Sequence, residues 1–108
     1  MKVLVKKTIQ YYIKKYPKAE TQLMIWYTEF SRQKFTNFNE LKTVYGNASI
    51  VNNNRVVFNI KGNDFRLVIS INFTQAASYI IWFGTHKEYD KIDVQTISFD
   101  TAILTHKK

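Results

Sequence analysis

The chain has 108 residues, and 45% of them are hydrophobic, so it can fold as one domain without a metal or a disulfide. It contains no cysteine, which excludes a disulfide framework, a thiolate nucleophile and a cysteine zinc site. Sixteen Lys and Arg residues against eight Asp and Glu residues give a net charge of +8. Most of the excess lies in residues 1–60. A basic surface of this size attracts a polyanion, either nucleic acid or an acidic protein, unless it serves solubility alone.

The sequence carries no targeting signal that we can identify. No apolar run approaches the roughly 18–20 residues that a membrane span requires. The first ten residues, MKVLVKKTIQ, contain only a short apolar stretch and no small-residue cleavage site. We therefore expect a cytoplasmic protein.

The first part of the chain predicts a short strand at 2–5 followed by helices. Apolar residues recur at helical spacing in two stripes, namely Ile9, Tyr12, Ile13 and Tyr16, then Leu23, Trp26, Tyr27 and Phe30. Pro17 ends the first stripe. Asn37 and Glu40 form a capping pair that opens a short third helix. Its inward residues are expected to be Phe38, Leu41 and Tyr45.

After Gly46 the apolar period changes from helical to two, which predicts strands. The residues that face one way are Val56, Phe58 and Ile60, then Phe65, Leu67, Ile69, Ile71 and Phe73. Between these runs, KGND at 61–64 offers a two-residue Gly-Asn hairpin turn. A further strand, YIIWFG, has Tyr79, Ile81 and Phe83 on one side and Ile80 and Trp82 on the other.

Segregated helices and strands predict an α+β fold, with two to three helices packed on one face of an antiparallel sheet. The other face is expected to stay partly polar and to form a concave basic surface that could hold a strand of RNA. Its residues are Arg55, Asn59, Arg66, Ser70 and Asn72.

The segment GTHKEYDKID, residues 84–93, supports two interpretations. Thr85 and Glu88 have the spacing of a capping box, which places His86 in the first turn of a short helix with Tyr89 and Asp90 as neighbours. One interpretation is a helix cap that only docks Tyr89 on the sheet. The other is a catalytic site, because Arg66 on the polar face could point toward the same region.

A histidine, a tyrosine hydroxyl and an arginine that converge on a basic surface suit cleavage of an RNA phosphodiester. That reaction needs a base for the ribose 2′-OH proton, an acid for the 5′-oxygen and a cation for the phosphoryl charge. Free imidazole titrates near neutral pH and can do either proton transfer. No metal or cofactor is required. By this reasoning the hairpin could also lie at the opposite end of the sheet, which would count against Lys61 and Asn63.

Two ordered motifs resemble the HigB-type toxins, which belong to the RelE-like mRNA interferases of bacterial type II toxin–antitoxin modules. The first is the strand pair FNIKGNDFRL, residues 58–67, and the second is GTHKEYDKI, residues 84–92. Weaker similarity reaches back through YP at 16–17 and ELKTVYGNAS at 40–49. The resemblance covers about residues 1–97 as a single toxin domain and leaves 98–108 as an extension of unknown structure.

The resemblance implies a small RelE-like α+β endoribonuclease that cleaves mRNA, often on translating ribosomes, and arrests growth. Its partner would be a HigA-type helix-turn-helix antitoxin. The family's functional positions carry over to Asn63 and Arg66 in the first motif and to His86, Lys87 and Tyr89 in the second. We expect His86, Arg66 and Tyr89 to be catalytic. The residues expected to contact RNA phosphates are Lys61, Asn63, Lys87 and Arg55.

Two other functions stay open at this point. One is a toxin-fold protein without nuclease activity that blocks a ribosome or a topoisomerase through its basic, aromatic surface. The other is a remnant that only binds an antitoxin. Fold alone does not separate these functions from a nuclease.

Overall fold

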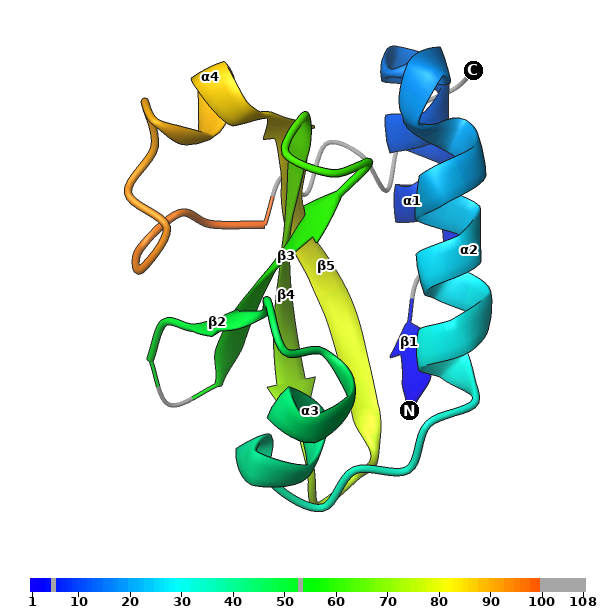
Figure 1. Ribbon diagram of the computed structural model, residues 1–108, viewed down its shortest axis with the longest axis vertical. Coiled ribbons are helices and arrows are strands. Elements are labelled where there is room, and N and C mark those ends of the chain that lie inside the picture. Colours follow the sequence, from blue (N-terminus) through cyan, green and yellow to red (C-terminus); the bar gives the residue numbers. More distant parts are fainter. Residues whose placement is uncertain (5, 53, 100–108) are drawn as a thin grey trace.

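A computed structural model describes residues 1–4, 6–52 and 54–99, and in it a five-stranded sheet is flanked by helices (Figure 1). The strands are β1 (Lys2–Leu4), β2 (Ser49–Ile50), β3 (Arg55–Ile60), β4 (Phe65–Asn72) and β5 (Ala77–Thr85). The helices are α1 (Lys6–Lys15), the 3₁₀ turn η1 (Pro17–Ala19), α2 (Glu20–Ser31), α3 (Phe38–Val44) and α4 (His86–Tyr89). The α+β class and the packing of helices on one sheet face are confirmed.

Two predicted helix boundaries are confirmed, the end of α1 before Pro17 and the start of α3 after Asn37. Pro17 follows the end of α1, since proline cannot donate the hydrogen bond that would continue the helix. At the start of α3, the Asn37 side chain accepts a hydrogen bond from the Glu40 backbone N–H at 2.9 Å. No helix in the described part of the chain is both long and apolar enough to cross a membrane.

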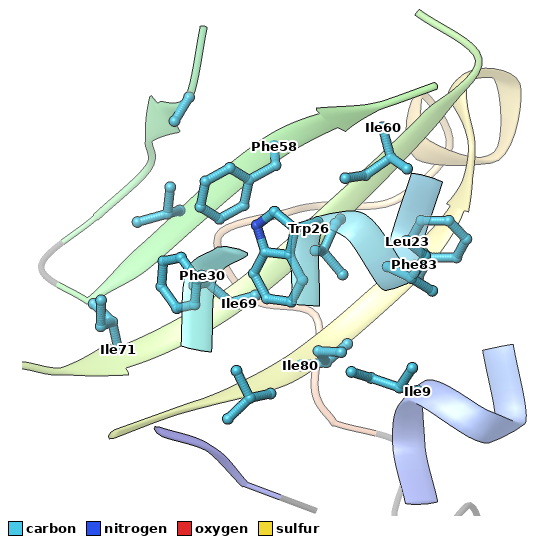
Figure 2. Packing of buried hydrophobic residues seen from close by; sticks show 14 of the residues in the cluster. Ile9, Leu23, Trp26, Phe30, Phe58, Ile60, Ile69, Ile71, Ile80 and Phe83 are labelled. Atoms are coloured by element: carbon cyan, nitrogen blue, oxygen red, sulfur yellow. The ribbon is translucent and has the colours of Figure 1, made fainter. Parts of the chain in front are cut away.

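The main core lies between the sheet and the helices α1 and α2, and it is rich in aromatic rings (Figure 2). Trp26 and Phe30, one turn apart on α2, stack at 4.9 Å between ring centroids. Phe58 of β3 meets both rings, at 5.5 Å and 5.7 Å. Each such side chain contributes about 1.5–3 kcal/mol by leaving water. The helical stripes predicted to face the core therefore do so.

The strand order is β1-β5-β4-β3-β2. The strands β3, β4 and β5 form the predicted antiparallel meander. The short strand β1 joins the other side of β5 in parallel, with Lys2 opposite Ala77, and β2 extends the opposite edge. The β1–β5 pairing joins segments that are distant in the chain, whereas β2 and β3 are consecutive strands; neither edge pairing was predicted.

A β-bulge in β5 overturns the predicted alternation of that strand. The register shifts between Val68 and Ile69, so that Val68 pairs with Trp82 and Ile69 pairs with Ile80. Ile81 is the extra residue of the bulge. Beyond it, each side chain of β5 points to the sheet face opposite to the one that simple alternation predicts. Ile80 and Phe83 consequently face the main core, whereas Ile81 and Trp82 face the other side.

The second face of the sheet is not the open basic surface that we expected. Val57, Val68 and Ile81 form a buried apolar cluster there. Covering residues pack on this cluster, and they are Val51, Trp82, Tyr89, Val94, Ile97 and Phe99. Ser70 is also buried. The prediction was wrong because it overlooked two apolar residues on this face. Val57 and Val68 alternate with the core residues of their strands, so they point to the second face, where they must also be shielded from water.

The segment that follows α4 provides much of this cover, on the side of the sheet away from α1 and α2 (Figure 1). Phe99 packs edge-on against Tyr79 of β5, with 6.2 Å between ring centroids. Residues 100–108, most of the predicted 98–108 extension, lie outside the described residues.

Candidate active site

The hairpin at 61–64 and the end of β5 lie at the same end of the sheet (Figure 1). The chain reverses direction twice between β3 and β5, so β5 ends where β3 ends, and Phe65 pairs with Thr85. The backbone N–H of His86 donates to the Asp64 carbonyl at 2.9 Å. The alternative placement of the hairpin at the opposite end is therefore wrong, and Lys61 and Asn63 belong to this end.

The hairpin is present as predicted, but its connection has four residues, 61–64, in place of the predicted two, and the Asp64 N–H donates to the Lys61 carbonyl at 3.2 Å. Gly62 has a φ of 63°, which glycine adopts without strain. Lys61 also has a positive φ, 56°, which is uncommon for a residue with a Cβ. The turn places the Asn63 side chain beside the start of β4.

Arg66 is the centre of the site, and its guanidinium is held from three directions. Nη2 donates to Oδ1 of Asn63 at 2.7 Å. Nη1 donates to the backbone carbonyls of Asn63 and Phe65 at 3.3 and 3.2 Å. Nη2 also lies 2.7 Å from Nδ1 of His86. The planar fork of arginine suits such a set of acceptors, and a lysine could not satisfy it.

The contact with Arg66 assigns the tautomer of His86. A guanidinium has only donors, so Nδ1 of His86 must accept, and the proton of the neutral ring then sits on Nε2. Nε2 lies 3.5 Å from Oδ2 of Asp90, one turn along the chain. The imidazole is thus oriented by a cation on one nitrogen and a carboxylate on the other.

The predicted capping box is present at the start of α4. The Glu88 N–H donates to Oγ1 of Thr85 at 3.1 Å, and Oε1 of Glu88 accepts from the Thr85 N–H at 2.9 Å. The cap and the site are not alternatives. Thr85 and Glu88 form the cap, while the His86 side chain between them faces Arg66.

Tyr89 is a further neighbour of the guanidinium. Cζ of Arg66 is 5.9 Å from the centroid of the Tyr89 ring, which is within range of a cation–π interaction. Burial raises the pKa of the Tyr89 hydroxyl, the nearby Arg66 charge lowers it, and Asp90 adds a smaller rise. The phenol therefore keeps its proton at neutral pH and is available as a donor.

Comparison with known proteins identifies the family of this chain. The family model described as HigB_toxin, RelE-like toxic component of a toxin–antitoxin system, matches residues 19–92. The chain belongs to the HigB toxin family. The "mRNA interferase toxin HigB" of Escherichia coli (strain K12) is 29% identical over 92 residues, which are 83% of this chain and 88% of that protein. Proteins named "mRNA interferase HigB" from Escherichia coli O157:H7 and Shigella flexneri are similar to the same extent.

In this HigB-family toxin, the residues expected to contact RNA are only partly gathered. Asn63 bonds directly to Arg66, and Lys61 sits in the hairpin with an exposed ion pair to Asp64 at 3.5 Å. Lys87 is exposed on α4. Arg55 stands apart at the far end of β3, where Nη1 donates to the Val94 carbonyl at 2.9 Å. In this structure Arg55 holds the segment that covers the second sheet face.

Sequence reasoning missed Trp82 and Gly84 as parts of the site. Gly84 lies opposite Arg66 in the sheet, and a Cβ on it would come within 2.6 Å of the Trp82 ring and 2.8 Å of Oε1 of Glu88. Trp82 in turn meets Tyr89 at 6.2 Å between ring centroids. The available signal was a glycine inside a strand, which often marks a close approach.

Metal ligands are not gathered in the described part of the chain, where no three His, Asp or Glu side chains form a group that could hold an ion. The charged groups at the site include Arg66, Glu88, Asp90 and Lys87, together with the ion pair of Lys61 and Asp64.

Proposed function

We propose that this toxin is an endoribonuclease that cleaves mRNA by acid–base transesterification and thereby inhibits growth. The observation that supports it is the contact between the Arg66 guanidinium and the His86 imidazole, which puts a fixed cation beside a proton carrier. The HigB relatives named as mRNA interferases give the substrate class.

In the proposed reaction the scissile phosphate binds at Arg66. The guanidinium exchanges its bond with Nδ1 of His86 for bonds to the phosphoryl oxygens, which its fork geometry favours. The charge that develops on these oxygens is then stabilised by a cation that is already in place. In this scheme protein side chains supply both the positive charge and the proton transfers, so the reaction requires no metal or cofactor.

Release from Arg66 leaves the lone pair on Nδ1 of His86 free to accept the proton of the ribose 2′-OH. The 2′-oxygen attacks the phosphorus, a 2′,3′-cyclic phosphate forms, and the bond to the 5′-oxygen breaks. Asp90 stabilises the imidazolium through Nε2, 3.5 Å away in the free protein. The Tyr89 hydroxyl, which keeps its proton at neutral pH, protonates the departing 5′-oxygen.

The neighbouring lysines and Asn63 would hold the flanking RNA. Lys61 and Lys87 lie on either side of the site, in the hairpin and on α4, and both are exposed. We propose that they contact phosphates next to the scissile one. Asn63 keeps the guanidinium oriented through its bond at 2.7 Å. Arg55 is left out of this proposal, because its guanidinium is bonded to Val94 at the far end of β3.

Toxins of this kind are held in check by an antitoxin, and we propose a HigA-type helix-turn-helix protein as the partner. We further propose that cleavage takes place in the cytoplasm on translating ribosomes, where mRNA is single-stranded and positioned.

The test is the chemistry of the products. A short mRNA, placed in purified translating ribosomes, is cleaved with the purified toxin, and the ends are analysed. We expect a 2′,3′-cyclic phosphate upstream and a 5′-hydroxyl downstream, with no cleavage when the ribose at the scissile position is 2′-deoxy. A downstream 5′-phosphate, or equal cleavage of the deoxy-substituted mRNA, would contradict the mechanism. Blocked translation with intact mRNA would point instead to a toxin that obstructs the ribosome.

A further inference from the structure

Tyr16 connects the helical layer formed by α1 and α2 to α4, the short helix that carries His86. It lies between α1 and η1, and its hydroxyl donates to Oε1 of Glu88 at 2.6 Å. The two residues are 72 positions apart in the chain. This hydrogen bond therefore joins α4 to the layer formed by α1 and α2.

The ring of Tyr16 is fixed by two phenylalanines that precede site residues. It packs edge-on against Phe65 at 5.6 Å and against Phe83 at 5.8 Å between ring centroids. Phe65 and Phe83 are themselves stacked at 5.3 Å. Phe65 comes directly before Arg66, and Phe83 comes directly before Gly84, which lies opposite Arg66 in the sheet. The position of the Tyr16 hydroxyl is thus set by β4, which carries Arg66, and by the neighbouring strand β5.

Glu88 belongs to α4, so its bond with the Tyr16 hydroxyl restricts the position of this helix. The oxygen that accepts from Tyr16 also accepts from the Thr85 N–H at 2.9 Å, and the Glu88 N–H returns a bond to Thr85. The Tyr16 bond and the Thr85 cap together lower the pKa of the Glu88 carboxyl. In turn, burial and the Glu88 carboxylate raise the pKa of the Tyr16 hydroxyl. Both groups therefore keep the charge-assisted form of the bond at neutral pH.

We propose that Tyr16 is a positioning residue of the nuclease: through Glu88 it sets the orientation of α4, and hence the distance between His86 and Arg66. The proposal rests on the proposed function. A helix of four residues has little intrinsic stability, so its orientation depends on the bonds at its ends. Two of these bonds, from Tyr16 and Thr85, meet on the same Glu88 oxygen.

Loss of the bond should slow the chemical step more than it weakens RNA binding. Arg66 and Lys61, which bind phosphates, lie outside α4 and stay in place when the Tyr16 hydroxyl is removed, whereas the imidazole on α4 gains freedom. A misplacement of about 1 Å in a catalytic group can cost about a hundredfold in rate. We therefore expect the maximal cleavage rate of Tyr16→Phe to fall by about 10- to 100-fold, with a half-saturating RNA concentration within about twofold of wild type.

Tyr16→Phe is the appropriate variant because it keeps the ring against Phe65 and Phe83 and removes only the hydroxyl. Tyr79→Phe is the matched control, since Tyr79 lies on β5 well before the site and packs against Phe99. Single-turnover cleavage of ribosome-bound mRNA is measured for both variants, together with their thermal unfolding. Tyr79→Phe should cleave like wild type.

A double-mutant cycle with Glu88→Ala separates positioning from a general loss of stability, because alanine removes the oxygen that accepts from Tyr16. If Tyr16 acts through Glu88, the double variant should be no slower than Glu88→Ala alone. The ¹⁵N signals of the His86 ring, read in histidine-labelled toxin, should shift in Tyr16→Phe. Neither result is expected of a residue that only supports the fold.

Several outcomes would overturn the proposal. They are a Tyr16→Phe variant that cleaves at the wild-type rate, rate losses of Tyr16→Phe and Glu88→Ala that multiply in the double variant, and unchanged His86 signals. An inactive wild-type toxin would instead refute the nuclease function. The His86 signals would still test the positioning role in that case, because their shift does not depend on cleavage.

Discussion

Nη2 of Arg66 and Nδ1 of His86 are 2.7 Å apart, although the two residues come from a strand and a helix that are 20 positions apart. The contact joins the strongest cation of the site to the residue best suited to move a proton. It also selects the Nε2–H tautomer, because the guanidinium can only donate. In the free toxin the base is thus masked by the group that would bind the substrate phosphate.

Replacement of His86 tests the proton transfer. His86→Ala should lose at least about a hundredfold in cleavage rate, since a positioned general base contributes about 10²–10⁴ in rate. Its half-saturating RNA concentration should change little, because Arg66 and the lysines remain. Single-turnover cleavage of ribosome-bound mRNA is the measurement. Cleavage at the normal rate would mean that the histidine is only part of a helix cap.

Arg66→Ala should lose about 10²–10³ in rate, as expected when a preorganised donor to a developing charge is removed. Arg66→Lys should be almost as slow, because an ammonium cannot reproduce the fork toward Asn63 and His86. The melting temperature of both variants should stay within about 4 °C of wild type, since the side chain is partly exposed. A large loss of thermal stability would instead make Arg66 a structural residue.

Gly84→Ala tests the close packing behind the site. The added Cβ would lie 2.6 Å from the Trp82 ring and 2.8 Å from Oε1 of Glu88, so both must move. Overpacking of this kind usually costs about 1–3 kcal/mol in the free energy of unfolding. Urea denaturation measures it, and the tryptophan emission should change with the displaced ring. Gly46→Ala is the control, because an added Cβ there meets nothing within 4 Å. Equal stability of the two variants would contradict the packing.

Lys61 and Lys87, beside the site, should contribute to the affinity for RNA. Lys61→Ala and Lys87→Ala should each raise the half-saturating RNA concentration and leave the maximal rate nearly unchanged. Each lost phosphate contact should also reduce the slope of log affinity against log salt by about 0.7 for single-stranded RNA. Lys34→Ala, before α3, is a matched control and should not alter the slope. An unchanged slope in Lys61→Ala and Lys87→Ala would remove them from the RNA-binding surface.

The acid dependence of stability should reveal the lowered pKa of Glu88. Tyr16 and Thr85 hold the folded-state pKa of this carboxyl below its ordinary value of 4.5. The charged cap therefore contributes fully above pH 4.5 and is lost as the pH falls through the folded-state pKa. Wild type should be more stable than Glu88→Gln at pH 7, and the difference should shrink below pH 4.5. Urea denaturation at several pH values checks this, and a constant difference would count against the bond.

Much of the fold follows from local patterns in the sequence. The stripes that include Ile9 and Leu23 predict helices, and the alternation from Phe65 to Phe73 predicts β4. The bulge at Ile81 has no such signal, because YIIWF is apolar on both sides and fits either register. The pairing of β1 with β5 joins residues 2–4 to 77–79, and periodicity carries no information about so distant a partner.

The candidate site was predictable in its residues more than in its geometry. The spacing of Thr85 and Glu88 predicts the helix cap next to His86, and the resemblance to the family's motifs indicates Asn63 and Arg66. Counting the two chain reversals would have placed the hairpin beside α4. The bond from Tyr16 to Glu88 could not be predicted, since a tyrosine at the end of a core stripe is usually only a core residue.

The most direct test of the central claim is to map RNA 5′ ends in cells after brief induction of the wild-type toxin and of His86→Ala. The account predicts new 5′ ends within coding regions for the wild type and none for the variant, although both proteins accumulate in folded form. Growth arrest by the wild type without new 5′ ends would contradict the nuclease function.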